Sequence, residues 1–140
     1  MEPLERPGIV FQSADPRTSD LVGNELVKRY GADYTIRTCA DPGALRPTVD
    51  ALAADGVPIC VVLAGVGTTD PAGIPLVAGL RDAYPAARRG VVVSWGDFGR
   101  ADEVFAAVAD GSIEYFLIRP EQVRDEEFHR SLTEILEEWS

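Results

Sequence analysis

Short apolar runs alternate along the chain with longer amphipathic stretches. Five runs rich in β-branched or aromatic residues predict strands, namely Gly8–Phe11, Tyr34–Cys39, Ile59–Leu63, Val91–Val93 and Tyr115–Ile118. The run Tyr34–Cys39 is half polar, which favours an edge strand. The run Ile59–Leu63 is continuously apolar, which is typical of a central strand in a parallel sheet.

The stretches between these runs carry apolar residues at helical spacing and predict five helices. The expected helices run from Asp15 to Gly31, from Asp41 to about Gly56, around Leu76–Leu80 up to Tyr84 and Pro85, from Asp102 to Asp110, and from Asp125 to Trp139. The first two begin at an Asp-Pro pair, in which Asp suits the N-cap and Pro suits the first helical position.

Strict alternation of five strands and five helices predicts a doubly wound α/β domain. We expect a five-stranded parallel sheet in the order 2-1-3-4-5, with helices on both faces and residues 1–140 forming a single domain. The chain has 140 residues, 46% of them hydrophobic, which is enough for one packed core.

No apolar run approaches the ~20 residues that cross a bilayer. The polar N-terminus lacks the basic and apolar regions of a secretory signal, so we expect no membrane association and a cytoplasmic location. The two cysteines, Cys39 and Cys60, lie in strand-like runs and are expected to be buried free thiols. The single histidine, His129, lies in an acidic helix and is expected to face solvent.

The formal net charge of −10 argues against nucleic acid as a partner, because phosphate binding needs clustered Lys and Arg. The last twenty residues hold seven acids against two arginines. We expect most of these acids to form a solvated helix face, which can also orient a basic partner.

A site in such a sheet lies where the carboxyl ends of the strands meet the switch point. The residues that follow the first, third, fourth and fifth strands are Gln12–Asp15, Gly65–Asp70, Ser94–Asp97, and Arg119 with Pro120.

Several motifs resemble the receiver domains of two-component response regulators, over nearly the whole chain. Glu114–Pro120 looks like the family's fifth strand, an aromatic followed by a Lys-Pro pair. Val61–Ala64 looks like the strand that leads to the phosphate-accepting Asp, and Ala72 with Gly73 stands where receivers often have Asn-Gly. The resemblance implies a flavodoxin-like, or CheY-like, fold and a role in signal transduction.

Shorter motifs resemble receiver domains joined to thioredoxin-reductase-like flavoproteins. These motifs are Arg29–Gly31, Tyr84–Arg89 and the ending at Trp139. They imply that the partner is a flavoprotein module on the C-terminal side.

The family's phosphorylation site is incomplete in this sequence. Gly65 stands at the phosphoacceptor position and has no nucleophile, and the two positions that hold Mg²⁺ in receivers carry Ser13 and Ala14. The neighbouring Asp15 is acidic, but its simplest role is that of a helix N-cap. We therefore expect no catalytic residue, no metal and no cofactor.

The remaining positions of the family's site are partly kept. Ser94 retains the hydroxyl that follows the fourth strand, and Arg119 replaces the Lys with a different cationic group. Phe116 matches the aromatic that reports activation, and Trp95 occupies a position that is usually small, where it is expected to fill part of the vacant pocket.

Two alternatives remain for the loop after the third strand. Asp70, followed by Pro71, is expected to start a turn or to cap the next helix, and the alternative is a relocated phosphoacceptor. The segment Gly65–Thr69 also has the glycines and hydroxyls of a phosphate cradle, although Asp70 would repel a phosphate there.

The main hypothesis is an atypical receiver that acts without Asp phosphorylation, through binding of a protein partner or through homodimerisation. The family's docking face is made by the helix 102–110, the strand 115–118 and the last helix, and here it is expected to include Trp95, Phe105, Tyr115 and Phe116. The alternatives are a small-molecule or anion-binding regulatory domain at Gly65, Ser94 and Arg119, and a receiver phosphorylated at Asp70.

Overall fold

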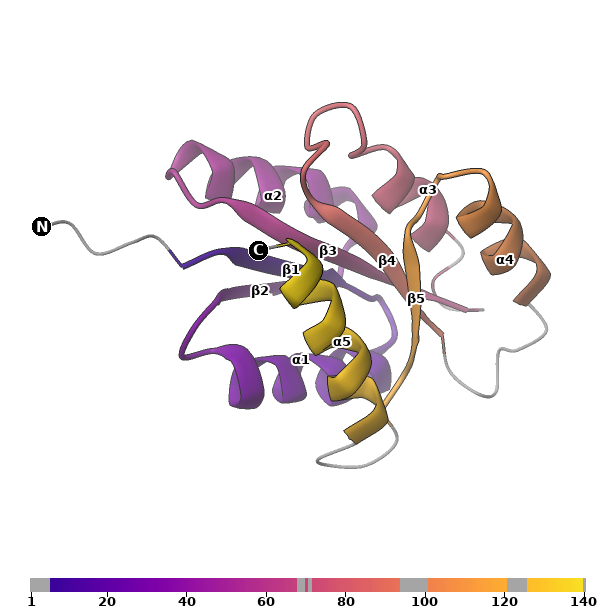
Figure 1. Cartoon of the computed structure of the whole chain (residues 1–140), viewed down its shortest axis with the longest axis horizontal. Helices are drawn as coiled ribbons and strands as arrows, with labels where there is room; N and C mark the ends of the chain where they lie inside the picture. Colours follow the sequence, from indigo (N-terminus) through magenta and orange to yellow (C-terminus); the bar gives the residue numbers. More distant parts are fainter. Residues whose placement is uncertain (1–5, 68–69, 71, 94–100, 121–125, 140) are drawn as a thin grey trace, which may run out of the picture.

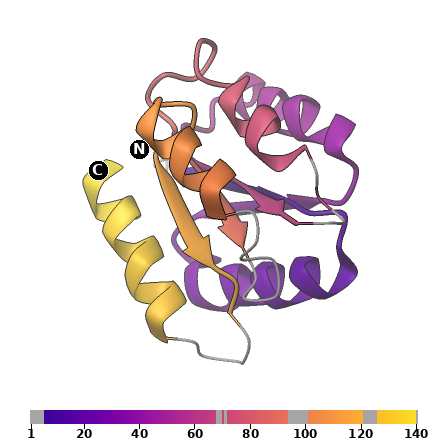
Figure 2. The ribbon, with the colours of Figure 1, turned by 90° about the vertical axis from the view of Figure 1, so that its right-hand side faces the viewer.

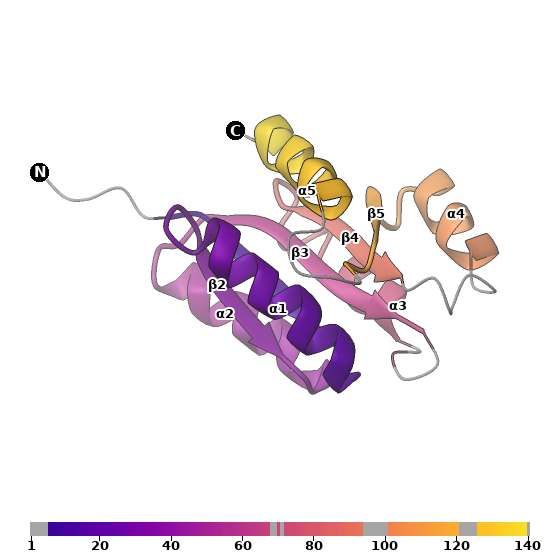
Figure 3. The same ribbon diagram turned by 90° about the horizontal axis from the view of Figure 1, so that it is seen from below.

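Five parallel strands form one sheet in the order β2-β1-β3-β4-β5, as the sequence predicts (Figure 1). The computed structural model describes residues 6–67, 70, 72–93, 101–120 and 126–139. The strands are β1 (Gly8–Gln12), β2 (Thr35–Cys39), β3 (Ile59–Val66), β4 (Arg88–Val93) and β5 (Tyr115–Ile118). β2 and β5 are the two edges, and Figure 3 shows β2 and β5 at opposite ends of the sheet.

Five helices cover the two faces of the sheet (Figure 2). They are α1 (Pro16–Tyr30), α2 (Leu45–Ala54), α3 (Gly73–Ala78), α4 (Ala101–Ala109) and α5 (Glu126–Trp139). One apolar cluster joins the sheet to α1 and α5, and a second joins it to α2, α3 and α4. The continuously buried strands β1 and β3 lie between the two clusters, which is why their sequences are apolar except for Gln12 at the end of β1.

Two strands are three residues longer than the apolar runs that predict them. β3 continues to Val66, because Ala64, Gly65 and Val66 pair with β4. β4 begins at Arg88, three residues before the valine run. Its two arginines stay in the ladder because Glu114 accepts hydrogen bonds from both guanidinium groups, at 3.0 Å and 3.1 Å.

The helix boundaries differ from the predicted ones at two places. Asp41 caps a 3₁₀ turn (Pro42–Ala44), its carboxylate accepting from the Gly43 N–H at 2.9 Å, and α2 follows that turn. α3 ends at Ala78, well before the predicted end at Tyr84. The end predicted near Gly56 is confirmed, since Gly56 has a φ of 83° that favours glycine.

Candidate functional site

The carboxyl end of β1 lies beside the carboxyl end of β3. The register pairs Gln12 with Ala64, so Ser13 and Gly65 follow as neighbours at the edge where a site is expected. A side chain at Gly65 would have no room in this arrangement. Its Cβ would lie 2.6 Å from Asp70 Oδ2 and 3.0 Å from Ser13 Oγ.

Asp70 fills the space beside Gly65 with its own carboxylate. The residue is only 6% exposed, although it lies in a loop. Asp70 Oδ2 accepts a hydrogen bond from the Ser13 hydroxyl at 2.6 Å, and Oδ1 accepts one from the Ala14 N–H at 2.6 Å. Both oxygens are therefore engaged by the loop that follows β1, and the carboxylate lies where an acidic side chain on β3 would project.

Asp70 ends a turn instead of starting one, and it does not cap the next helix. Its backbone closes a turn with Gly67, through hydrogen bonds of 3.1 Å and 3.3 Å. The predicted helix cap is wrong, because α3 begins at Gly73 with Ala72 at the N-cap and no side-chain cap. The carboxylate turns inward because the missing side chain at Gly65 leaves a volume with two hydrogen-bond donors around it.

A second group of polar side chains adjoins the first. Thr18 donates a hydrogen bond to Asp15 Oδ2 at 2.6 Å, and Arg119 donates one to the Thr18 hydroxyl at 3.0 Å. Arg119 also lies 3.6 Å from Asp15 Oδ2. These contacts hold the pKa of Asp15 below its usual value, first through the Thr18 hydrogen bond and also through the charge of Arg119.

Ser13 joins the two groups, since its hydroxyl donates to Asp70 and accepts from the Asp15 N–H at 3.1 Å. Asp15 occupies the N-cap position of α1 as predicted, but its carboxylate receives the Thr18 hydroxyl instead of capping the backbone. The structure thus brings together Ser13, Ala14, Gly65 and Asp70, with Asp15 and Arg119 beside them. Ser94 and Trp95, together with Thr68 and Thr69 of the loop, lie outside the described residues.

The other predicted residues gather on the surface of α4 and β5. Phe105 on α4 and Phe116 on β5 are 51% and 39% exposed. Their rings meet edge to face, with centroids 5.6 Å apart. Tyr115 donates a hydrogen bond to Glu138 of α5, and burial together with this carboxylate raises the pKa of Tyr115 to about 12.

The prediction for His129 is wrong. The side chain is 1% exposed and lies between α5 and α1, with Nε2 3.2 Å from Glu25 Oε2 and Nδ1 3.2 Å from the Tyr30 hydroxyl. The buried imidazole of His129 is tolerated between the helices because α1 supplies polar partners for both ring nitrogens. The contacts are structural ones between two helices.

Both cysteines are free thiols. Cys60 is fully buried and Cys39 is half-buried, so the expected burial is complete for Cys60 only. Burial raises the pKa of Cys60 to about 12, which makes it an inert core residue. Among the described residues, no cluster of three or more His, Cys, Asp or Glu side chains is placed to hold a metal ion. No helix in the described part of the chain has the length and apolar character needed to span a membrane.

No protein-family model matches the sequence, and no curated protein matches it either. Solved structures match in fold. The signal receiver domain of an HD domain-containing protein from Pseudomonas fluorescens Pf-5 is 21% identical, with a TM-score of 0.66 over 99% of this chain and 93% of that chain. A CheY-like response regulator receiver domain protein from Methanospirillum hungatei JF-1 is 14% identical, with a TM-score of 0.67 over 95% of each chain.

The receiver domain of NtrX from Brucella abortus is 17% identical, with a TM-score of 0.67 over 92% of this chain and 98% of that chain. The strand order and these likenesses give the chain the CheY-like, flavodoxin-like fold of receiver domains.

Proposed function

We propose that this chain is an atypical receiver domain that serves signal transduction without Asp phosphorylation. One observation carries the proposal, namely the Asp70 carboxylate that occupies the space beside Gly65. In a receiver, the side chain at the position of Gly65 would accept the phosphoryl group. Here that position has no side chain, and its volume already holds a hydrogen-bonded acid.

The surroundings of Asp70 argue against its use as a relocated acceptor. An attacking carboxylate oxygen needs access to a phosphodonor, whereas Asp70 is 6% exposed and gives both oxygens to Ser13 and Ala14. The metal positions hold a serine and an alanine, and Asp15 is held by Thr18 and Arg119. A phosphoryl group would therefore lack the divalent cation that neutralises its charge.

The same carboxylate disfavours the small-molecule alternative. An anion placed beside Gly65 would meet the negative charge of Asp70 at close range, which is unfavourable in a buried site. Arg119, the cation expected to attract such an anion, is directed at Thr18 and Asp15.

With the pocket filled, the proposed activity is protein binding through a constitutive surface. We assign it to the face made by α4, β5 and α5, where Phe105 and Phe116 are exposed beside Tyr115. The partner is a separate protein or a fused module, such as a flavoprotein, and we place the complex in the cytoplasm.

Backbone amide spectra of the full chain test the proposal. Mg²⁺ is added first and beryllium fluoride second, since that complex mimics a phosphoryl group on a carboxylate. We expect the amide signals of Ser13, Gly65 and Asp70 to stay in place through both additions, and an active receiver run in parallel to shift. Saturable shifts at these three residues, absent in Asp70→Asn, would contradict the proposal and identify Asp70 as an acceptor.

A further inference from the structure

β2 leaves one edge of the sheet open, at the end opposite to β5. It pairs with β1 alone, and Figure 1 shows α2 and α1 on the two sides of it. The Thr35 N–H donates to the Pro7 carbonyl at 2.8 Å, so the backbone of Thr35 faces the β1 side. Residues of a parallel strand face alternate sides, and the backbone groups of Ile36 and Thr38 therefore point away from the sheet. Such an edge is a template for another strand.

One cation occupies part of the open edge. The Arg37 guanidinium donates a hydrogen bond to the Ile36 carbonyl at 3.0 Å, and Arg37 is an exposed residue. In the part of the chain that the structure describes, the Ile36 N–H and the backbone groups of Thr38 have no protein partner. A charged residue on an edge strand keeps unrelated strands from pairing with it. A carboxylate that binds Arg37 would leave the Ile36 carbonyl free to accept from another strand.

A groove of about 550 Å³ lies along this edge. Its walls come from α1 and the turn after it, from the end of α2, and from β2, in the order Val27 and Tyr34, Leu52 and Asp55, Ile36 and Arg37. Val27 is 57% exposed, and it is the only large hydrophobic residue of the described chain that is exposed outside α4 and β5. The side chains of an added strand would alternate between the two sides of the groove, and Val27 offers an apolar contact on the α1 side.

Two guanidinium groups line the groove without a carboxylate partner. Arg6 and Arg37 each donate to a backbone carbonyl at 3.0 Å, and among the described residues neither forms an ion pair. Asp55 is the one described carboxylate on the walls, and Asp33, near Tyr34, is not a lining residue. The groove therefore presents more positive than negative charge, and a carboxylate in it would gain charge-assisted hydrogen bonds.

A second copy of β2 is a poor occupant of the open edge. Arg37 is the middle residue of the strand, so the two-fold pairing that aligns β2 fully with itself brings the two copies of Arg37 together. Like charges opposite each other on neighbouring strands destabilise the pair. Each chain also carries a net charge of −10, which opposes association.

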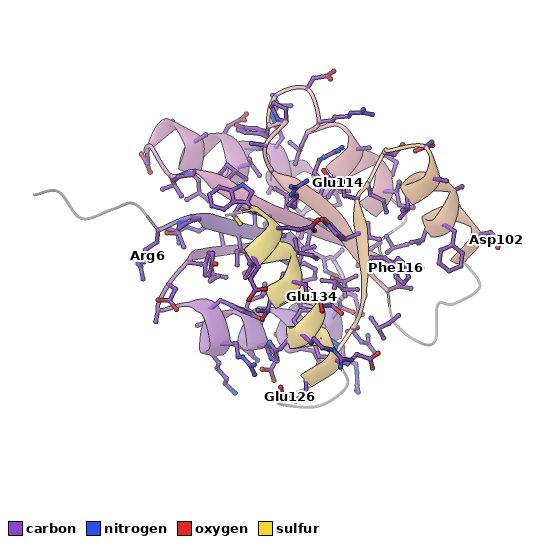
Figure 4. All side chains as sticks on the ribbon, in the orientation of Figure 1. Arg6, Asp102, Glu114, Phe116, Glu126 and Glu134 are labelled. Carbon is purple, nitrogen blue, oxygen red and sulfur yellow. The ribbon has the colours of Figure 1, made fainter. Side chains whose placement is uncertain are left out.

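We propose that the open edge of β2 binds an extended peptide segment with an acidic side chain, by strand addition. The Asp or Glu of the segment binds Arg37, with Arg6 in the same groove, and an N–H of the segment takes the place of Arg37 on the Ile36 carbonyl. The main chain supplies affinity at Ile36 and Thr38, and the acid decides which segment binds. This site does not depend on the proposed face of α4, β5 and α5, and Figure 4 shows Arg6 and Phe116 on opposite sides of the molecule.

The probes are three short peptides, blocked at both ends and titrated into the whole ¹⁵N-labelled chain. The first alternates Val and Thr around one central Glu, the second has Gln in place of that Glu, and the third is the Glu peptide with its backbone nitrogens methylated. We expect the Glu peptide to bind and to slow hydrogen exchange at the Ile36 and Thr38 amides. We expect the other two to bind at least about tenfold more weakly, because one lacks the charge and the other cannot donate to the edge.

Paired variants separate the edge from general attraction between charges. Arg37→Gln should bring the affinities of the Glu and Gln peptides within about twofold of each other, and it should bind the Gln peptide at least as tightly as the parent does, because the Ile36 carbonyl is free. Arg46→Gln, which removes an exposed cation from an ion pair on α2, should keep the preference for the Glu peptide. Val27→Ser should weaken the Glu peptide about threefold or more, and Val108→Ser on α4 should leave its affinity within about twofold.

Strand addition is refuted by weak binding of all three peptides, by equal binding of the Glu peptide and its methylated form, or by Ile36 and Thr38 amides that stay unprotected when the Glu peptide is saturating. The role of the acid is refuted by equal binding of the Glu and Gln peptides to the parent protein, or by a preference that persists in Arg37→Gln. Protection of the Ile36 amide in the free chain that fades on dilution would assign the edge to a second copy and refute the proposal as well. Each of these results leaves phosphorylation-independence standing, and that proposal fails separately, if Asp70 responds to beryllium fluoride.

Discussion

Asp70 and Ser13 are joined by a 2.6 Å hydrogen bond across 57 residues of sequence. The bond ties the loop after β3 to the loop after β1, on either side of Gly65. Gly65 allows this contact, because a Cβ there would collide with the Asp70 carboxylate and with Ser13. The inward position of the Asp70 carboxylate therefore depends on the absence of a side chain at Gly65.

The coupling of Gly65 to Asp70 is measurable in a double-mutant cycle. Gly65→Ala should lower the free energy of unfolding by about 1–3 kcal/mol, because its Cβ overpacks a filled site. In an Asp70→Ala background the same change should cost at least about 0.5 kcal/mol less, since the clashing carboxylate is gone. Urea unfolding of the four proteins gives the coupling energy.

Gly23→Ala serves as the matched control for this cycle. Gly23 lies inside α1, and a Cβ there meets only Thr38 Cγ2 of β2, at 3.5 Å, an ordinary van der Waals contact. The substitution Gly23→Ala should leave the free energy of unfolding unchanged or raise it by up to about 1 kcal/mol. Strict additivity of Gly65→Ala and Asp70→Ala would show that the two positions do not share one volume.

Removal of the Asp70 carboxylate alone should also destabilise the chain. Asp70→Ala leaves the Ser13 hydroxyl and the Ala14 N–H without their acceptor, at about 1–3 kcal/mol for each buried donor. Asp20→Ala, on the exposed face of α1, should lie within about 0.5 kcal/mol of the parent protein. Equal stability of the two variants would indicate that Asp70 is a surface residue.

Asp15 should contribute to the pH dependence of stability. Its pKa is lowered in the folded chain from a usual value of 3.8, first by Thr18 and also by Arg119. A depressed pKa adds stability that is present above the unfolded value and is lost as pH falls through the folded value. The contribution is at most about 1 kcal/mol, because the carboxylate is partly exposed.

The comparison is between the parent protein and Asp15→Asn, unfolded in urea at neutral pH and at pH values below 3.8. We expect the parent to lose more stability than the variant over this interval, and Asp20→Asn to follow the parent. A variant curve parallel to that of the parent at every pH would contradict the assigned contacts.

Thiol reactivity should follow burial. Cys60 is fully buried with a pKa of about 12, so a thiol reagent should leave it unmodified in the native chain at mildly alkaline pH. Cys39, half-buried with a more modestly raised pKa, should react first. In the Cys39→Ser variant Cys60 is the one remaining thiol, so the mass increase reports its labelling alone. Rapid labelling of Cys60 without denaturant would contradict its buried position.

The contact between α1 and α5 depends on the Tyr30 hydroxyl, which donates to the His129 carbonyl at 3.2 Å and lies 3.3 Å from the Thr133 hydroxyl. Tyr30→Phe should lower the free energy of unfolding by about 1 kcal/mol. Tyr84→Phe provides a comparison, since the Tyr84 hydroxyl bonds the exposed Asp50. A larger loss in Tyr84→Phe would reverse the expected order.

The fold could be predicted because the local pattern of apolar and polar residues indicates each strand and helix. Ile59–Leu63 is apolar at every position, as a strand buried on both faces must be, and the alternation of elements leaves one natural strand order. The ends of the elements depend on partners far away in sequence. Arg88 and Arg89 belong to β4 only because Glu114 lies across from them.

The candidate site could be predicted in part. Gly65, Ser13 and Ala14 are recognisable by their places after the strands, and the structure brings them together. The inward turn of Asp70 depends on a cavity that no local pattern encodes. His129 is a similar case, since its polar partners lie on α1, about a hundred residues away.

The proposed function requires that this chain forms no phosphorylated Asp, and the intact mass of the full chain measures whether one forms. The chain is incubated with acetyl phosphate and Mg²⁺ beside an Asp70→Asn variant and an active receiver. We expect an unchanged mass for both forms of this chain while the active receiver gains one phosphoryl group. A phosphoryl adduct on the parent chain that is absent from Asp70→Asn would refute phosphorylation-independence and make Asp70 the acceptor of a functioning switch.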